Sequence, residues 1–124
     1  EQQTLRAFYR QLLRVARSEK AITQGDMYDL TYAQGEGFNK HEQYAFIRKY
    51  KKQTLLVVLN FDDRQVDMQV RIPQDAFEYL KLEEESLAKA EDLLTGTEYT
   101  FPLHPHTPIC LTLPAWKGVI LKIK

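Results

Sequence analysis

The spacing of apolar residues changes at about residue 25. Before that point, apolar residues recur every three or four positions, which predicts an amphipathic helix within residues 1–24. After it, short stretches alternate apolar and polar residues, the pattern of strands with one buried face. The predicted helix needs a large apolar surface to lie on. Its apolar stripe would consist of Leu5, Phe8, Tyr9, Leu12, Leu13, Val15 and Ala16.

The most strongly patterned stretch is "TLLVVLNFDDRQVDMQVRI", residues 54–72. Its continuous apolar run, residues 55–59, predicts a strand covered on both faces and therefore the central strand of a sheet. After the turn-like "NFDDRQ", a second strand alternates, so we expect one of its faces in the core and the other in water. The inward residues of that strand would be Val66, Met68, Val70 and Ile72.

Further elements are predicted on both sides of this stretch. Pro73 starts a short helix in "PQDAFEYLKL", Gly96 predicts a hairpin turn, and Pro114 separates the last two strands. About seven strands after one long helix indicate a mainly β, antiparallel sandwich over residues 25–124. The earliest strands would be "DMYDLTY", with Tyr28, Leu30 and Tyr32 on one face, and "QYAFIRKY", with Tyr44, Phe46 and Tyr50 on one face.

Composition narrows the classes of partner. The 124 residues are 44% hydrophobic and 27% charged, which is typical of one globular domain. Seventeen basic and seventeen acidic residues cancel, which disfavours a nucleic-acid partner, and no apolar run is long enough to cross a membrane. The single cysteine, Cys110, lies in a strand-like "ICLTL", where we expect the sulfur to pack as a small hydrophobe. The first residue is not methionine, which predicts a fragment of a longer protein.

No residue pair has the pattern of a catalytic acid and base. Asp62 and Asp63 are adjacent in a turn, where aspartate commonly bonds its own backbone. Residues 83–85 form an acidic run typical of a solvated helix end or loop. His104 and His106 supply two imidazoles but no obvious third ligand. We therefore expect no metal site and no cofactor.

Two other features have competing interpretations. Sugar rings stack on aromatic side chains, so Trp116 and the tyrosines are candidates for carbohydrate contact, although we expect Tyr28, Tyr44 and Tyr50 in the core. Alternatively, Trp116 caps the sandwich or packs on a neighbouring domain. A stripe of arginines on the predicted helix could contact phosphate, but in a neutral chain it more often forms a solvated face or ion pairs. The stripe consists of Arg6, Arg10, Arg14 and Arg17.

The order of motifs resembles the carboxy-terminal end of α-amylase-family enzymes, glycoside hydrolase family 13. "LRAFYRQLLRVARSEKAITQGDMYDL" is similar to the "FYRxLLxLR"-like helix that closes the family's catalytic (β/α)8 barrel, followed by the "G-x-(Y/F)" strand that opens domain C, here Gly25 to Tyr28. "LVVLNF", "AEDLLTG" and "LPAWKGVILKI" continue the resemblance. The chain departs from the family at "RVARSEKAI" and at Lys117, which leaves the subfamily open.

This resemblance implies two parts. Residues 1–24 would be the last helix of an otherwise absent barrel, and residues 25–124 a Greek-key-like β-sandwich of the domain C type, with residues 54–72 as its central hairpin. The family's catalytic carboxylates lie upstream on barrel strands, so the fragment would have no catalytic residue. The parent would be a retaining hydrolase of starch or maltodextrin. Interdomain packing would involve Leu5, Phe8, Leu12 and Leu13.

Three functions remain open at this point. The first is a structural domain that stabilises the catalytic barrel of the same chain. The second is an accessory carbohydrate-binding module that contacts α-glucan, and the third is an unrelated sandwich used for protein interaction. A broad apolar patch would favour docking, whereas clustered exposed aromatics would favour sugar binding. Without the barrel, the helix stripe would lack its partner, which predicts that the helix folds back on the sandwich or pairs with another copy of the chain.

Overall fold

The computed structural model describes Ala7, Arg10, Arg14 and residues 25–35, 37–39 and 41–123. The described part of residues 25–123 includes eight strands, one α-helix and one short 3-10 helix, and every strand pairing in it is antiparallel. The mainly β prediction is therefore confirmed. The elements are β1 (Asp26–Asp29), η1 (Thr31–Ala33), β2 (Gln43–Tyr50), β3 (Gln53–Asn60), β4 (Val66–Val70), α3 (Gln74–Leu80), β5 (Glu85–Asp92), β6 (Glu98–Leu103), β7 (Ile109–Leu113) and β8 (Lys117–Ile123).

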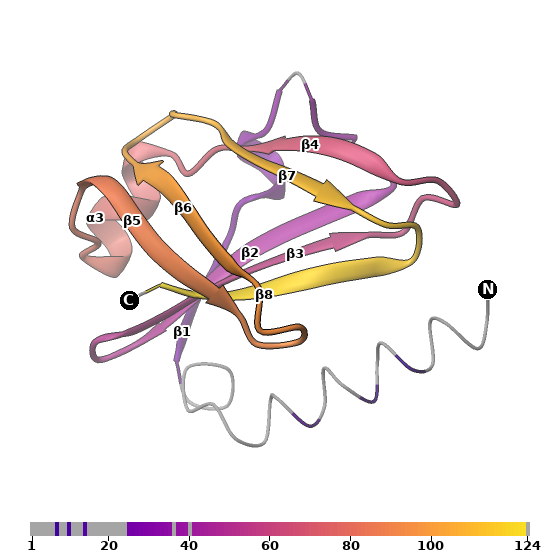
Figure 1. Cartoon of the computed structure of the whole chain (residues 1–124). Helices are drawn as coiled ribbons and strands as arrows, with labels where there is room; N and C mark the ends of the chain where they lie inside the picture. Colours follow the sequence, from indigo (N-terminus) through magenta and orange to yellow (C-terminus); the bar gives the residue numbers. More distant parts are fainter. Residues whose placement is uncertain are drawn as a thin grey trace.

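The strands form two sheets that lie in two layers (Figure 1). The larger sheet has the order β1-β2-β3-β8-β5-β6, and the smaller one pairs β4 with β7. As predicted, β3 is an interior strand, and its residues 54–60 are all buried. The Greek-key-like connectivity and the domain boundary at residue 25 stay predictions.

Residues 54–72 do not form the hairpin that the resemblance implied. β3 pairs with β2 and β8, whereas β4 pairs with β7 in the other sheet. Residues 61–65 carry the chain between the layers, and the buried side chain of Asn60 holds this turn. Its Nδ2 donates to the carbonyl oxygens of Arg64 at 3.0 Å and Pro114 at 3.1 Å, while its Oδ1 accepts from the Asp62 N–H at 3.0 Å. A change of layer replaces the simple hairpin because each strand buries its apolar face in the core between the sheets.

The first predicted strand is shorter than expected. β1 ends at Asp29, and Tyr32 lies in η1 with its side chain exposed, so the expected alternation through Tyr32 is wrong. The Asp29 carboxylate accepts from the Thr31 N–H at 2.9 Å, a local bond that competes with strand pairing. The buried Gln34 side chain then joins η1 to the segment after β4. Its Nε2 donates a hydrogen bond to the Arg71 carbonyl oxygen at 2.6 Å, and its Oε1 accepts one from the Arg71 N–H at 2.7 Å.

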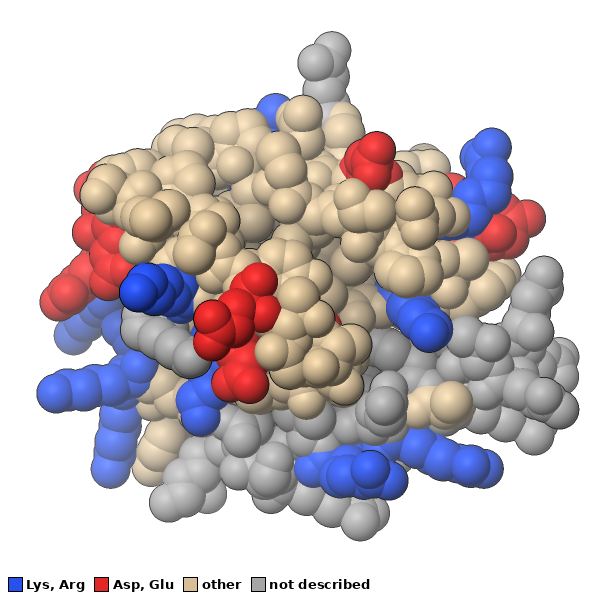
Figure 2. Space-filling model, in the orientation of Figure 1, with Lys and Arg blue, Asp and Glu red and all other residues tan. Residues whose placement is uncertain are grey.

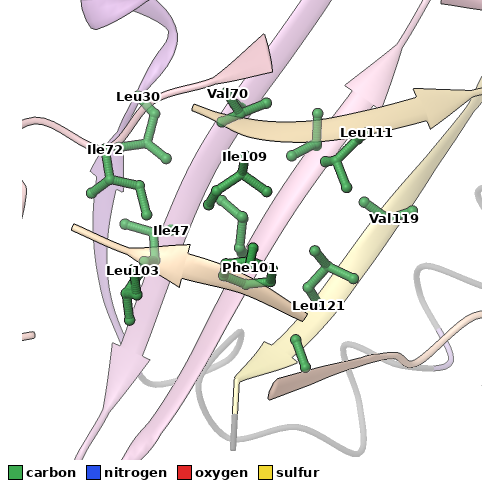
Figure 3. Close-up of a cluster of buried hydrophobic side chains, with 14 of the residues drawn as sticks. Leu30, Ile47, Val70, Ile72, Phe101, Leu103, Ile109, Leu111, Val119 and Leu121 are labelled. Carbon is green, nitrogen blue, oxygen red and sulfur yellow. The ribbon is translucent and has the colours of Figure 1, made fainter. Parts of the chain in front are cut away.

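The main core lies between the two sheets (Figure 3). The predicted alternation after β3 is confirmed, since Met68, Val70 and Ile72 are buried. The short helix is confirmed as α3, whose Phe77 and Leu80 join the same core. β7 also alternates, but Cys110 lies on its exposed side, so the expected burial of the thiol is wrong. The labelled members of the core are Leu30, Ile47, Val70, Ile72, Phe101, Leu103, Ile109, Leu111, Val119 and Leu121.

The turn between β5 and β6 combines a glycine with a buried carboxylate. Gly96 has a φ of +79°, which confirms the predicted hairpin turn and explains why glycine suits it. Asp92 is buried, and its Oδ1 accepts from the N–H groups of Leu94 at 3.1 Å and Ile120 at 3.2 Å. Its Oδ2 accepts from the Thr95 hydroxyl at 2.9 Å. The carboxylate thereby fixes the β5–β6 turn against β8.

The predicted helix of residues 1–24 lies mostly outside the described residues. Of its residues, Ala7, Arg10 and Arg14 are described, and all three are helical and exposed. This agrees with the interpretation of the arginine stripe as a solvated face for Arg10 and Arg14. The predicted packing residues Leu5, Phe8, Leu12 and Leu13 lie outside the described residues, as do Arg6 and Arg17.

Candidate docking and ligand-binding surfaces

A second apolar cluster lies on the other face of the large sheet. Because side chains alternate along a strand, β3 sends Leu56 and Val58 into the main core and its other apolar residues to the opposite side. We call that side the outer face. Its buried members are Leu55, Val57, Leu59 and Ile120.

Partly buried side chains surround this cluster. Tyr44 and Phe46 on β2 are in ring contact, with centroids 5.4 Å apart. Partial burial raises the pKa of the Tyr44 hydroxyl, and the nearby Asp29 carboxylate adds to the effect. The prediction that Tyr44, Phe46 and Tyr50 share a face is confirmed, but that face is the outer one. The surrounding residues are Tyr44, Phe46, Tyr50, Phe61, Leu93 and Leu94.

Three tyrosines form a second surface feature, whose assembly the sequence did not predict. The ring centroid of Tyr28 on β1 lies 6.1 Å from that of Tyr32 and 5.8 Å from that of Tyr79 on α3. Tyr32 and Tyr79 are 57% and 62% exposed, whereas Tyr28 is partly buried against the main core. The Tyr28 and Tyr32 hydroxyls are hydrogen-bonded, and this bond, with partial burial, raises the pKa of Tyr28 to about 12. We call this group the tyrosine cluster.

Trp116 stands apart from the tyrosine cluster. It lies in the turn between β7 and β8 with a φ of +59°, and its backbone N–H donates to the Asp62 carbonyl oxygen at 3.3 Å. Its side chain is partly buried, and within the described part of the chain it has no aromatic ring contact. The local spacing of Tyr28 and Tyr32 signalled their contact, but only the packing of α3 brings Tyr79 to them.

The charged candidates do not assemble a catalytic or metal centre. Asp62 and Asp63 both approach Arg64, with N–O distances of 3.7 and 3.9 Å. His104 Nδ1 lies 2.9 Å from a Glu84 carboxylate oxygen, and His106 occupies a turn with a φ of +64°. Among residues 25–123 as described, no group of three His, Cys, Asp or Glu side chains could hold a metal ion.

No helix among the described residues is both long and apolar enough to span a bilayer.

Comparisons with known proteins agree with this architecture. Residues 38–124 match the family "Alpha amylase, C-terminal all-beta domain". The chain therefore belongs to that family. It contains a non-catalytic C-terminal domain of α-amylase-family enzymes, so the described sandwich is not itself the catalytic unit. None of the curated proteins compared with it matches.

Solved structures show the same fold in longer proteins. The chain is similar to an alpha-amylase from Geobacillus thermoleovorans in complex with acarbose, with a TM-score of 0.63 and 13% identity over 89% of this chain and 20% of the other. It is also similar to a noncanonic maltogenic alpha-amylase, AmyB from Thermotoga neapolitana, with a TM-score of 0.63 and 11% identity over 91% of this chain and 24% of the other. For a MutB double mutant in complex with isomaltulose, the TM-score is 0.55 and the identity 24% over 95% of this chain and 17% of the other. The chain thus spans a quarter or less of each of these proteins.

Proposed function

We propose that this domain is a structural support for the catalytic barrel of a starch- or maltodextrin-type α-glucan hydrolase. The observation that carries the proposal is the outer face. The large sheet buries one apolar face against β4, β7 and α3, and it has a second apolar face with four buried residues. A free-standing sandwich needs only one such face, because its other side can be polar. The second face therefore supports docking.

Residues 1–24 supply the docking partner in this proposal. Ala7, Arg10 and Arg14 are helical and exposed, and their spacings of three and four place them on one side of a helix. On the same helical period, Leu5, Phe8 and Leu12 fall on the opposite side, with Leu13 at its edge. We propose that this apolar side packs on the outer face and continues into the barrel. Burying each leucine or phenylalanine fully is worth about 1.5–3 kcal/mol.

A pair of substitutions in this chain tests the docking. Leu12→Ser should lower the thermal midpoint by several degrees, whereas Arg14→Ser on the exposed side should leave it nearly unchanged. Differential scanning calorimetry measures both variants. Equal effects of the two substitutions would contradict the proposed packing.

The same interface predicts behaviour of the isolated chain. Where the apolar side of the helix does not fold back on the outer face, it lacks its partner in the barrel, and the fragment should then self-associate through Leu5, Phe8, Leu12 and Leu13. Analytical ultracentrifugation should show a concentration-dependent dimer that Leu12→Ser weakens. A strictly monomeric fragment at high concentration would count against an uncovered stripe.

The tyrosine cluster favours a second candidate function, accessory binding of α-glucan. Exposed aromatic rings can stack on the apolar faces of pyranose rings, and Tyr32 and Tyr79 present such rings side by side with Tyr28. Trp116, the candidate from sequence, is partly buried in a turn and has a weaker claim. The cluster thus replaces Trp116 as the first surface to test.

Titration calorimetry with maltoheptaose distinguishes these surfaces. In this proposal, wild type binds saturably, Tyr79→Ala abolishes the heat, and Trp116→Ala leaves it unchanged. Loss of binding in Trp116→Ala alone would move the site to the β7–β8 turn. No heat in wild type would reject sugar binding and leave the structural role, which depends on the outer face, unaffected.

A further inference from the structure

We propose that a lysine-lined hollow beside the β2–β3 turn binds phosphate groups, carried by inorganic pyrophosphate or by a sugar phosphate. The hollow has a volume of about 390 Å³. Figure 2 shows Lys and Arg side chains projecting at the lower left, where Figure 1 places the β2–β3 turn. The lysines that line the hollow are Lys49, Lys51, Lys52 and Lys81.

These lysines concentrate positive charge in a chain whose net charge is zero. They come from three elements, namely β2, the two-residue turn after it, and the C-terminal end of α3. A smaller hollow of about 210 Å³ shares Lys49, Lys51 and Lys81 with the first and adds one carboxylate, Asp26, so the positive surface continues beyond one depression. Multiple ammonium groups from separate elements suit a compact anion with several negative oxygens.

The backbone at two of the lysines is unfavourable for lysine. Lys51 has a φ of +55° in the hairpin turn, and Lys81 has a φ of +56° at the C-cap of α3. Glycine and asparagine are the usual residues at both kinds of position, because a Cβ is crowded in the left-handed region. Lysine at either position offers the turn no conformational advantage. Two such residues facing one hollow point to a role for their side chains in binding.

The charges of the hollow are only partly occupied by contacts within the protein. Lys49 Nζ donates to the Lys81 carbonyl at 2.8 Å, which ties β2 to the end of α3, and Lys51 Nζ lies 5.4 Å from the Tyr50 ring centroid. The ion pairs among the described residues involve Arg64 and His104, and none of the four lysines. An incoming anion would therefore not have to displace a described carboxylate from Lys51, Lys52 or Lys81.

The remaining lining determines which anion fits. Leu82, Leu103 and Ile123 provide apolar surface, which lowers the local dielectric and strengthens charge interactions. Glu83 and Glu85 also line the hollow, and they leave a formal excess of two positive charges. This balance favours a small, highly charged phosphate compound over a long acidic polymer, which the two carboxylates would repel.

Isothermal titration calorimetry on the full chain tests the site, with inorganic pyrophosphate and glucose 6-phosphate as separate probes. Wild type should bind at least one of them saturably, and the stronger probe identifies the source of the phosphate. The double variant Lys51→Gly/Lys81→Gly should weaken that binding about tenfold or more, since two charged contacts are lost. Its thermal midpoint should equal or exceed that of wild type, because glycine relieves both positive-φ positions. Glu83→Gln/Glu85→Gln should strengthen binding severalfold.

A matched control removes two lysines elsewhere. Lys89 and Lys117 are exposed and do not line the hollow. The Lys89→Gln/Lys117→Gln variant should bind the probe nearly as wild type does. The proposal fails if neither probe binds saturably, if the Lys51/Lys81 variant retains wild-type affinity, or if the control variant loses binding to the same extent.

Discussion

The two faces of the six-stranded sheet are both apolar, but they are built differently. The inner face meets β4, β7 and α3, and its cluster draws buried residues from both sheets and the helix. The outer face has four buried residues on β3 and β8, surrounded by partly buried aromatic and leucine side chains. The inner face therefore stabilises the fold of the domain, whereas the outer face is suited to docking on a helix or on another domain.

Adjacent residues of β8 give the most direct test of this comparison. Leu121 faces the inner core and Ile120 the outer cluster, and both are fully buried. Leu121→Ala should lower the free energy of unfolding by about 3 kcal/mol, and Ile120→Ala by about 2, because the partly exposed neighbours of Ile120 can move into the cavity. Urea denaturation measures both variants.

The comparison sharpens in an intact parent enzyme. If the outer face docks on the barrel, the cost of Ile120→Ala should grow there while that of Leu121→Ala stays the same. An Ile120→Ala cost equal to or above that of Leu121→Ala in the isolated chain would remove the distinction between the faces.

A smaller effect is expected at Gly118, where β8 approaches β3 on the outer side. An added Cβ would lie 2.4 Å from the Val58 carbonyl oxygen and 2.7 Å from a Leu59 methyl carbon. Gly118→Ala should therefore cost about 1–2 kcal/mol through overpacking. Gly35→Ala is the control, because no atom lies within 4 Å of its added Cβ. Thermal denaturation that shows equal midpoints for the two variants would rule out the steric role of Gly118.

The smallest effect concerns tyrosines at the edges of the two faces. Tyr28 borders the inner core, and its hydrogen bond with Tyr32 raises its pKa to about 12, whereas burial raises the pKa of Tyr44 at the outer face. A pKa above the unfolded value of 10.0 stabilises the fold fully below pH 10, and this contribution is lost as pH rises toward 12.

Tyr32→Phe should therefore lower the pKa of Tyr28 and flatten the loss of stability above pH 10, while Tyr44 titrates as before. Ultraviolet absorbance titration of tyrosinate checks the pKa values, and denaturation at several pH values checks the stability. An unchanged Tyr28 titration in the variant would show that the hydrogen bond is not the main cause.

Local pattern predicted the elements well where one physical cause dominates. The apolar run in β3 and the alternation of β4 follow directly from burial, and the positions of Gly96 and Pro73 follow from backbone preferences. Prediction failed where a nonlocal or competing contact decides. β4 leaves β3 for β7, and the bond from Thr31 to Asp29 accompanies the early end of β1. The expected burial of Cys110 was wrong for a local reason, because the alternation of β7 places Ile109, Leu111 and Leu113 in the core and Cys110 on the other face.

By itself, the sequence determined the mainly β class, most strand positions and the resemblance to the C-terminal domain of α-amylase-family enzymes, because periodicity and motif order are properties of the chain alone. Only the tertiary structure decided which strands are neighbours, which face of β2 is the outer one, and which side chains gather at the surface. Tyr79 joins Tyr28, and Lys81 joins Lys51, across more than 25 residues of sequence, since the packing of α3 against the end of the sheet brings them together. Such contacts arise from the burial of distant apolar faces in a common core, which no local pattern encodes.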